Sequence, residues 1–171
     1  MSYRYGLVAS VIALAVSAQR HVPAGMDSGA GANAAVARCA VTPIRTSSLH
    51  QRDLAGLPWI EARPVSSGIT GYLFYAYGLH GTAAEPRIHG TMPDGRSTKI
   101  LWRIENAKAG RVLNVDGRNL TGGGAMHQLI PRASSPATDY PSILNVPAPG
   151  CWQFSLTSGA LRGTVRLRVI G

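Results

Sequence analysis

Residues able to carry acid–base or metal chemistry are few and widely spaced in this 171-residue chain. Its 8 carboxylates occur singly, so no paired acid and base can be identified. No serine lies in the Gly-x-Ser-x-Gly pattern of a nucleophile elbow. Three histidines of predicted loops could meet at one end of a sandwich and hold a metal, or could simply lie on the surface: His80, His89 and His127. We expect no enzyme, no cofactor and no metal, and keep a loop-borne metal or hydrolase site as a third hypothesis.

A strong excess of arginine is the clearest sign of a binding surface. The chain has a formal net charge of +9, and all of its 17 basic residues except Lys99 and Lys108 are arginine. Arg162, Arg166 and Arg168 share parity in the last predicted strand, so their side chains should point outward together. Such a stripe could hold a polyanion, such as an envelope polymer or a phospholipid surface. The alternative is a charged edge that prevents sheet-to-sheet aggregation. Nucleic acid is not expected as a partner.

A second candidate surface is the aromatic run from Tyr72 to Tyr77. Glycines at 71 and 78 bound the run, and its composition predicts a β-strand. Leu73, Tyr75 and Tyr77 would then lie on one face, which could offer tyrosines for stacking on a carbohydrate. The alternative is ordinary cross-strand aromatic packing.

The two cysteines predict a disulfide bond between Cys39 and Cys151. An even pair in an exported chain is typical of a bridge, and no Cys-x-x-Cys pair or nearby histidine pair indicates zinc. Two alternatives stay open, namely free thiols and a lipid anchor at Cys39. An anchor would need a small residue and an apolar stretch directly upstream, whereas Arg38 precedes Cys39.

The N-terminal residues indicate export. After Arg4, an apolar run of about 10 residues ends in Val16-Ser17-Ala18, too short to span roughly 30 Å of hydrocarbon. We expect a signal peptide over residues 1–18, with an uncleaved anchor as the alternative. Residues 19–38 are rich in alanine and glycine, contain almost no bulky apolar side chain, and predict a flexible tether. A domain over 39–171 follows, secreted or associated with the cell envelope, and no transmembrane segment is expected after cleavage.

Two-residue alternation in the C-terminal segment predicts an antiparallel β-hairpin over residues 151–170. With Trp102 of another predicted strand, its inward side chains should form the core: Trp152, Phe154, Leu156, Val165, Leu167 and Val169. Cys151 is out of phase with Trp152, so it should face away from the core and hold the N-terminal segment.

The rest of the domain predicts about seven to nine short strands and no amphipathic helix. Residues 45–68 look like a long loop, and Asp116-Gly117 looks like a tight turn or a bulge. Further strands are expected at the following places: Cys39 to Thr42, Thr98 to Ile104, Arg111 to Val115, Ala125 to Ile130 and Ser142 to Val146. This pattern favours an all-β, immunoglobulin-like antiparallel β-sandwich.

Several short motifs carry a family resemblance. They are Cys39-Ala-Val-Thr42, Gly71-Tyr-Leu-Phe74, Lys99-Ile-Leu-Trp102, Val115-Asp-Gly-Arg-Asn-Leu120 and Pro149-Gly-Cys-Trp152. Together they resemble small exported, lipoprotein-like bacterial proteins of uncharacterised function, which start with "CPVT" and have "GCW" near the C-terminus. This chain differs by having Ala40 in place of proline and a long tether before Cys39. The resemblance implies an exported sandwich domain and no active site. Two residues also match an immunoglobulin-like core: Trp102 is expected where such a core places its buried tryptophan, and Trp152 is expected in place of the corner tyrosine.

These observations support two leading hypotheses. The first is a non-enzymatic, secreted or envelope-associated interaction module that binds an unidentified macromolecule, either a protein or an envelope polymer. The second is a carbohydrate- or polyanion-binding module that uses Tyr75 and Tyr77 or the stripe of Arg162, Arg166 and Arg168. The fold by itself cannot choose between them, because sandwiches host many functions.

Overall fold

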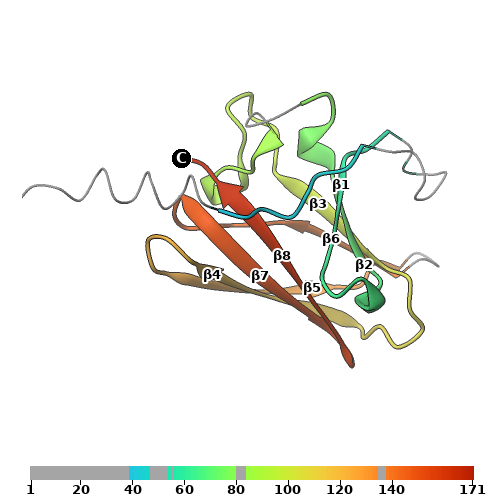
Figure 1. The fold of residues 1–171 in the computed structure, drawn as a ribbon. Coiled ribbons are helices and arrows are strands. Elements are labelled where there is room, and N and C mark those ends of the chain that lie inside the picture. The colour runs from blue at the N-terminus through green and yellow to red at the C-terminus, as the bar shows by residue number, and fades with distance from the viewer. Residues whose placement is uncertain (1–38, 47–53, 55, 80–83, 135–137) are drawn as a thin grey trace, which may run out of the picture.

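Two sheets, each of four antiparallel strands, face one another as a β-sandwich (Figure 1). This computed structural model describes residues 39–46, 54, 56–79, 84–134 and 138–171. The expected signal peptide over 1–18 and tether over 19–38 therefore lie outside the described residues. The all-β fold is confirmed, and the eight strands fall within the expected number.

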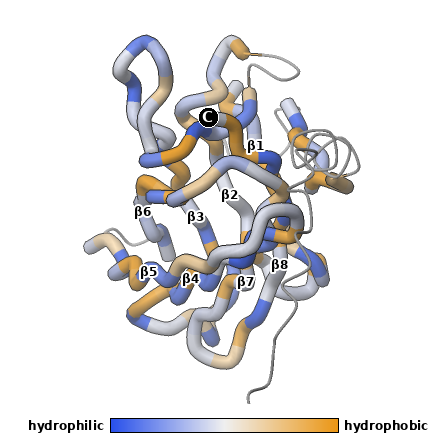
Figure 2. Tube along the Cα trace, turned by 90° about the vertical axis from the view of Figure 1, so that its left-hand side faces the viewer, coloured by the Kyte–Doolittle hydropathy of each residue, from blue (hydrophilic) through white to orange (hydrophobic). Residues whose placement is uncertain are grey.

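The first sheet has the strand order β1-β2-β3-β6 and the second β5-β4-β7-β8, with every pairing antiparallel. The strands of the first sheet are β1 (Trp59–Glu61), β2 (Ile69–Leu73), β3 (Lys99–Ile104) and β6 (Asp139–Ile143). Those of the second are β4 (Val112–Asn119), β5 (Ala125–Pro131), β7 (Gly150–Ser158) and β8 (Leu161–Val169). Short 3₁₀ turns complete the described elements: η2 (Val65–Ser67), η3 (Phe74–Ala76) and η5 (Ile88–Gly90). Figure 2 shows the two layers end-on, with β6 above β5 on one side and β1 above β8 on the other.

The core lies between the sheets and contains every residue predicted for it. Trp102 from one sheet and Trp152 from the other are fully buried, as are the alternating apolar side chains of β7 and β8. The closed hairpin register, in which Trp152 faces Leu167 and Phe154 faces Val165, confirms the predicted strand phase. The two large indoles also have their polar N–H groups satisfied. Trp102 Nε1 donates to Ser142 Oγ at 3.1 Å, and Trp152 Nε1 donates to the Ala148 carbonyl at 2.9 Å.

One predicted turn, and part of one predicted loop, form strands in the structure. The prediction of a tight turn or a bulge at Asp116-Gly117 is wrong, because β4 continues through both residues to Asn119 with an unbroken pairing register. A Cβ at Gly117 would lie 2.6 Å from Met126 Cγ and 3.0 Å from Phe154 Cε1, so the glycine serves close packing and no reversal of the chain. The predicted loop over 45–68 contains β1, a three-residue strand too short to show alternation.

Three predicted strand positions also differ from the structure. The residues Cys39 to Thr42 form no strand, because only Thr42 bonds to the main chain of β8. The aromatic strand ends at Leu73 and continues as the 3₁₀ turn η3. The strand expected over Ser142 to Val146 begins three residues earlier, at Asp139, which forms a buried bidentate ion pair with Arg103 (2.6 and 2.9 Å).

Among the described residues, no helix is long and apolar enough to cross a membrane.

Replacement of Trp152 tests the packing of the two sheets. Trp152→Ala should lower the free energy of unfolding by about 3–5 kcal/mol, because it removes a fully buried side chain and leaves a cavity. Trp152→Phe should cost less, since only part of the volume and the bond to the Ala148 carbonyl are lost. Urea unfolding followed by circular dichroism measures both. Equal losses for the two variants would contradict this account of the core.

Candidate functional site

The arginine stripe lies on the outer face of β8, as its parity predicts. Arg162 and Arg166 are exposed, and each is steadied by a polar neighbour on β7. Arg162 Nη1 donates to Thr157 Oγ1 at 2.8 Å, and Arg166 Nε donates to Gln153 Oε1 at 3.0 Å. Arg168 differs, because its guanidinium is paired with Glu85 at 2.5 Å and is 28% exposed. The stripe therefore contributes two available cations and one that is already neutralised.

Two further arginines reach the same face from other parts of the chain. Arg63 forms an antiparallel bridge with Thr164 of β8, so its side chain lies on the same face as that of Thr164. Arg118 of β4 is opposite Gln153, which in turn is opposite Arg166. Both Arg63 and Arg118 are exposed. We call Arg63, Arg162 and Arg166 the arginine cluster, since they surround Thr164.

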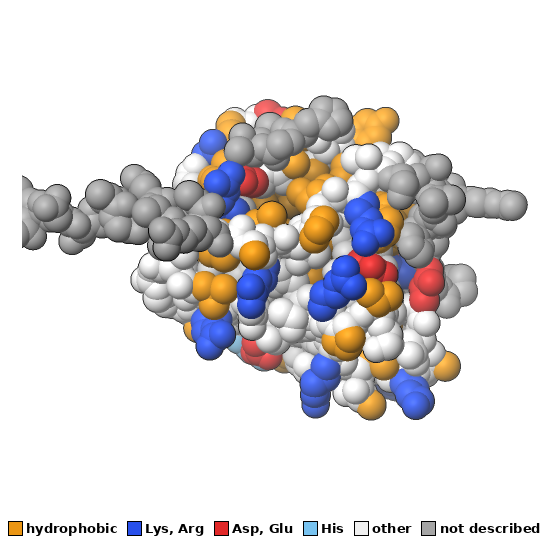
Figure 3. Space-filling view, viewed as in Figure 1, with side chains coloured by type: hydrophobic (Ala, Val, Ile, Leu, Met, Phe, Trp, Pro, Cys, Tyr) orange, Lys and Arg blue, Asp and Glu red, His pale blue; other side chains and the backbone are white. Residues whose placement is uncertain are grey.

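In the described part of the chain, the carboxylates near this face are paired with groups outside the cluster, including Glu61, which lies 3.9 Å from Arg45. Asp116 of β4 lies two strands from β8, which corresponds to about 10 Å, and it contacts His127 Nδ1 at 2.7 Å. Glu85 is bonded to Arg168. The face therefore carries a local excess of positive charge around Thr164, and Figure 3 shows lysine and arginine side chains spread over the side of the molecule that carries β7 and β8.

A shallow groove runs beside the cluster. It encloses about 290 Å³ and lies between β8 and the segment that precedes β1. Its polar wall consists of Arg63, Arg166, Thr42 and Thr164, and its apolar wall of Ala40, Val41 and Pro43. Guanidinium groups and hydroxyls are donors that suit phosphate, sulfate and carboxylate oxygens.

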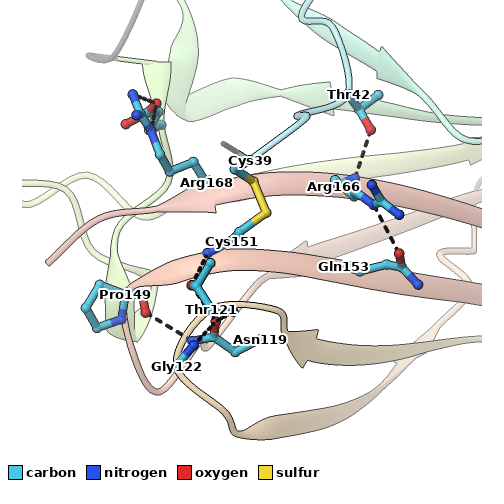
Figure 4. Close-up of a disulfide and its surroundings, with 11 residues drawn as sticks. Cys39, Thr42, Asn119, Thr121, Gly122, Pro149, Cys151, Gln153, Arg166 and Arg168 are labelled. Atoms are coloured by element: carbon cyan, nitrogen blue, oxygen red, sulfur yellow. Dashed lines mark hydrogen bonds and ion pairs between the residues drawn. A yellow bond between two sulfur atoms is a disulfide. The ribbon is translucent and has the colours of Figure 1, made fainter. Parts of the chain in front are cut away.

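The N-terminal segment that forms the other wall is fastened to the sheet at two points (Figure 4). The predicted disulfide joins Cys39 to Cys151 of β7, with the Cα atoms 5.5 Å apart. Three residues later, the Thr42 N–H donates to the Arg166 carbonyl, and Thr42 Oγ1 accepts from the Arg166 N–H, both at 2.8 Å. The segment then reaches the other sheet, where Arg45 and Trp59 exchange two main-chain hydrogen bonds. We call residues 39–45 the strap.

A buried polar network holds the end of β7 that carries Cys151. Asn119 is only 6% exposed, and its side chain donates to the Pro149 carbonyl at 3.1 Å and accepts from the N–H groups of Thr121 and Gly122. Thr121 Oγ1 accepts from the Cys151 N–H at 3.0 Å. The contacts give Asn119 and Thr121 a structural role, and sequence patterns alone did not reveal it.

The structure does not support a tyrosine platform. The turn η3 directs Tyr75 into the core, where it is 1% exposed, and Tyr72 is equally buried. Burial raises the pKa of the Tyr75 phenol well above its usual range, and the negative charge of Glu85 raises it further, so this group stays neutral. Only Tyr77 of the pair Tyr75 and Tyr77 is accessible, at 62% exposure. A single ring provides no ridge for successive sugars.

The three candidate metal-binding histidines are not brought together in the described part of the chain. His80 lies outside the described residues. His127 contacts Asp116 on the open sheet face, with both side chains more than half exposed, and His89 lies in the turn η5. No group of three histidine, cysteine or carboxylate side chains among the described residues could hold a metal ion.

No protein-family model, no curated protein and no solved structure matches the chain.

Loss of the disulfide should destabilise the domain and release the strap. The bridge closes a loop with a sequence separation of 112, for which the chain-entropy model gives up to about 4.7 kcal/mol. We expect the double variant Cys39→Ser/Cys151→Ser to lose about 2–5 kcal/mol in chemical denaturation, and the Thr42 amide to exchange faster with solvent. A variant as stable as the wild type, with unchanged exchange at Thr42, would contradict a structural role for the bridge.

Proposed function

We propose that this protein is a non-enzymatic, exported interaction module that binds an anionic envelope polymer through the arginine cluster. The observation that carries the proposal is the convergence of Arg63, Arg162 and Arg166 around Thr164, beside a groove that Arg63 and Arg166 line. The neighbouring carboxylates Asp116 and Glu85 are already paired. The disulfide bond and the expected signal peptide support export, because disulfides persist in oxidising compartments. Export also argues against nucleic acid as the natural ligand.

The covered edge of β8 favours a binding role over edge protection. Charged side chains often protect an open strand edge from pairing with another chain. Here the main chains of Thr42 and Arg63 already bond to Arg166 and Thr164, so part of this edge is occupied. Arg162 and Arg166 point across the sheet toward β7. Their charge is available for a ligand that lies on the face of the sheet.

An immunoglobulin-like fold, and membership of the exported family that the motifs resemble, form part of the proposal. The sets β2-β3-β6 and β4-β7-β8 have the pairing of the A-B-E and C-F-G strands of such sandwiches. Trp152 lies near the start of β7 and bonds to a carbonyl four residues upstream, as a corner tyrosine does. Trp102 does not have the role expected of it. The central tryptophan of such sandwiches lies on strand C, whose place β4 takes, whereas Trp102 lies on β3, in the place of strand B.

Removal of two clustered charges should weaken binding to polyanions. Long-chain polyphosphate and heparin are suitable probes, since each displays a dense row of anionic groups. The double variant Arg162→Gln/Arg166→Gln should bind both probes at least about tenfold more weakly at low salt. It should also reduce the magnitude of the slope of log K against log salt concentration by about 2. Isothermal titration calorimetry at several salt concentrations measures both quantities.

The matched control removes the same charge elsewhere. Arg96 lies in a turn beside Asp94, and Lys108 lies in the connection from β3 to β4. Arg96→Gln/Lys108→Gln should retain most of the affinity if the cluster is the site. Equal weakening in both double variants would show binding by net charge alone, and salt-independent binding would contradict the proposal. Preference for phosphatidylglycerol vesicles over both polymers would identify a lipid surface instead.

Glu85 limits the contribution of Arg168, and its removal should strengthen binding. Arg168 lies on the same face of β8 as Arg166, and Glu85→Gln removes the ion pair that neutralises its guanidinium. We expect polyphosphate affinity to rise by a few-fold at low salt, because a negative charge is lost beside the site. Titrations of the wild type and the variant in the same buffer make the comparison. Unchanged or weaker binding, with unaltered thermal stability, would show that Arg168 lies outside the site.

A further inference from the structure

The two sides of the sandwich are closed to very different degrees. On the β1 and β8 side, the strap spans from Arg166 to Trp59, Arg63 pairs with Thr164, and Ile170 exchanges main-chain bonds with Pro86 and Ile88. On the other side, β5 and β6 are the last strands of their sheets (Figure 2). Two bonds link this side across the gap: Gln128 Nε2 donates to the Ile143 carbonyl at 3.1 Å, and the Ala133 N–H, just after β5, donates to the Asp139 carbonyl at 2.8 Å.

Strand β5 has an edge that is not protected by the usual devices. Its residues 125–131 include no lysine, arginine or carboxylate, and its proline stands at the last position. Among the described residues, β5 pairs with β4 only. Strand β6, by contrast, has Pro141 at its centre, and a proline in a strand interrupts pairing along an edge. A seven-residue strand with an open, uncharged edge is suited to accept a further strand.

An apolar groove accompanies this edge. It encloses about 480 Å³, and its walls come from Leu129, Ile130 and Pro131 of β5 and from Pro141 and Ile143 of β6. Leu129 is 59% exposed and Ile143 is 46% exposed, and both line this groove beside the free edge. Alternate side chains of an added strand would point into this groove.

Charge decides what kind of strand fits. Lys99 lines the groove, Arg132 follows β5 directly, and the Arg132 N–H donates to the carbonyl of Arg111 at 2.9 Å. The carboxylates of the adjoining strands are engaged, since Asp139 is bonded to Arg103 and Asp116 contacts His127. A second copy of this chain would bring another net charge of +9 to a basic rim, whereas an acidic segment would be attracted to it.

We propose that an acidic polypeptide segment of a partner protein binds as an added strand along the free edge of β5. Main-chain hydrogen bonds to β5 supply affinity, apolar side chains of the segment enter the groove between Leu129 and Ile143, and its carboxylates meet Lys99 and Arg132. This surface lies on the open side of the sandwich, and the arginine cluster lies beside the strap on the other side, so one domain can hold a polymer and a protein at once.

The test uses the purified, oxidised protein and a synthetic peptide of eight residues in which valine alternates with glutamate. N-methylation of alternate amides prevents self-assembly and leaves one pairing edge. Titration followed by amide hydrogen exchange should show slower exchange along β5 and unchanged exchange along β8. A peptide methylated at every amide, or one with lysine in place of glutamate, should bind at least about tenfold more weakly.

Matched variants separate this surface from general effects of charge. Leu129→Lys should weaken binding about tenfold, because it puts a charge into the groove beside the edge. Val65→Lys makes the same change at a residue that is 47% exposed on the turn η2, which contacts β8, and should have little effect. Lys99→Glu/Arg132→Glu should reverse the preference toward the lysine peptide, whereas Arg96→Glu/Lys108→Glu should not.

Three outcomes would overturn the proposal. One is that the amides of β5 exchange with solvent as fast with millimolar peptide as without it. A second is protection that appears with rising protein concentration alone, together with a doubled mass in light scattering, which would identify a second copy as the occupant. A third is loss of peptide binding in Arg162→Gln/Arg166→Gln, which would assign the peptide to the arginine cluster. Failure of polyphosphate binding has no bearing on this result, because the two surfaces use different residues.

Discussion

The alternation of side chains along β7 is the constraint on which the rest of the structure depends. Its inward residues, Trp152, Phe154 and Leu156, fill the centre of the core between the two sheets. The same phase turns Cys151 outward, where it holds Cys39. A shift of one residue would turn the indole of Trp152 out of the core and turn the cysteine into it, away from Cys39. One pattern therefore sets both the packing of the domain and the position of its covalent link.

The strap, which the disulfide fixes to β7, shapes the surface beside β8. Because Cys39 is fixed to β7, the next residues must cross β8, and Thr42 meets the main chain of Arg166. The strap thereby covers the β8 edge and forms one wall of the groove beside Arg63 and Arg166. On the β5 side, the described residues link the sheets through the Gln128 bond to the Ile143 carbonyl and the Ala133 N–H bond to the Asp139 carbonyl, and no further strand pairs with the edge of β5. The two proposed surfaces thus follow from the same asymmetry.

Two of the short motifs that suggested a family, residues 115–120 and 149–152, have a common structural role. Gly117 of the middle motif lets Phe154 and Met126 pack closely, and Asn119 bonds to the carbonyl of Pro149. A Cβ at Gly150 would lie 2.6 Å from Asn119 Oδ1, so the network requires glycine there. These motifs are distant in sequence and adjacent in space. They stabilise the hairpin loop and the start of β7, and none of these contacts resembles catalytic machinery.

The sequence by itself determined the features that depend on local periodicity and on covalent chemistry. The hairpin of β7 and β8, its inward residues and the outward arginines were predictable, because strand parity is a property of a short segment. The Cys39–Cys151 bridge was predictable because the chain has only two cysteines, which allow a single pairing. The all-β class followed from the same patterns.

The tertiary structure decided everything that depends on which segments become neighbours. The pairing of Arg63 with Thr164 added a cation from a region expected to be a loop, and the pairing of Arg168 with Glu85 removed one from the stripe. The turn η3 buried Tyr75, because a 3₁₀ turn breaks the two-residue parity on which the exposed platform relied. Strand order, finally, set which edges are covered and which is free, and no local pattern encodes that order.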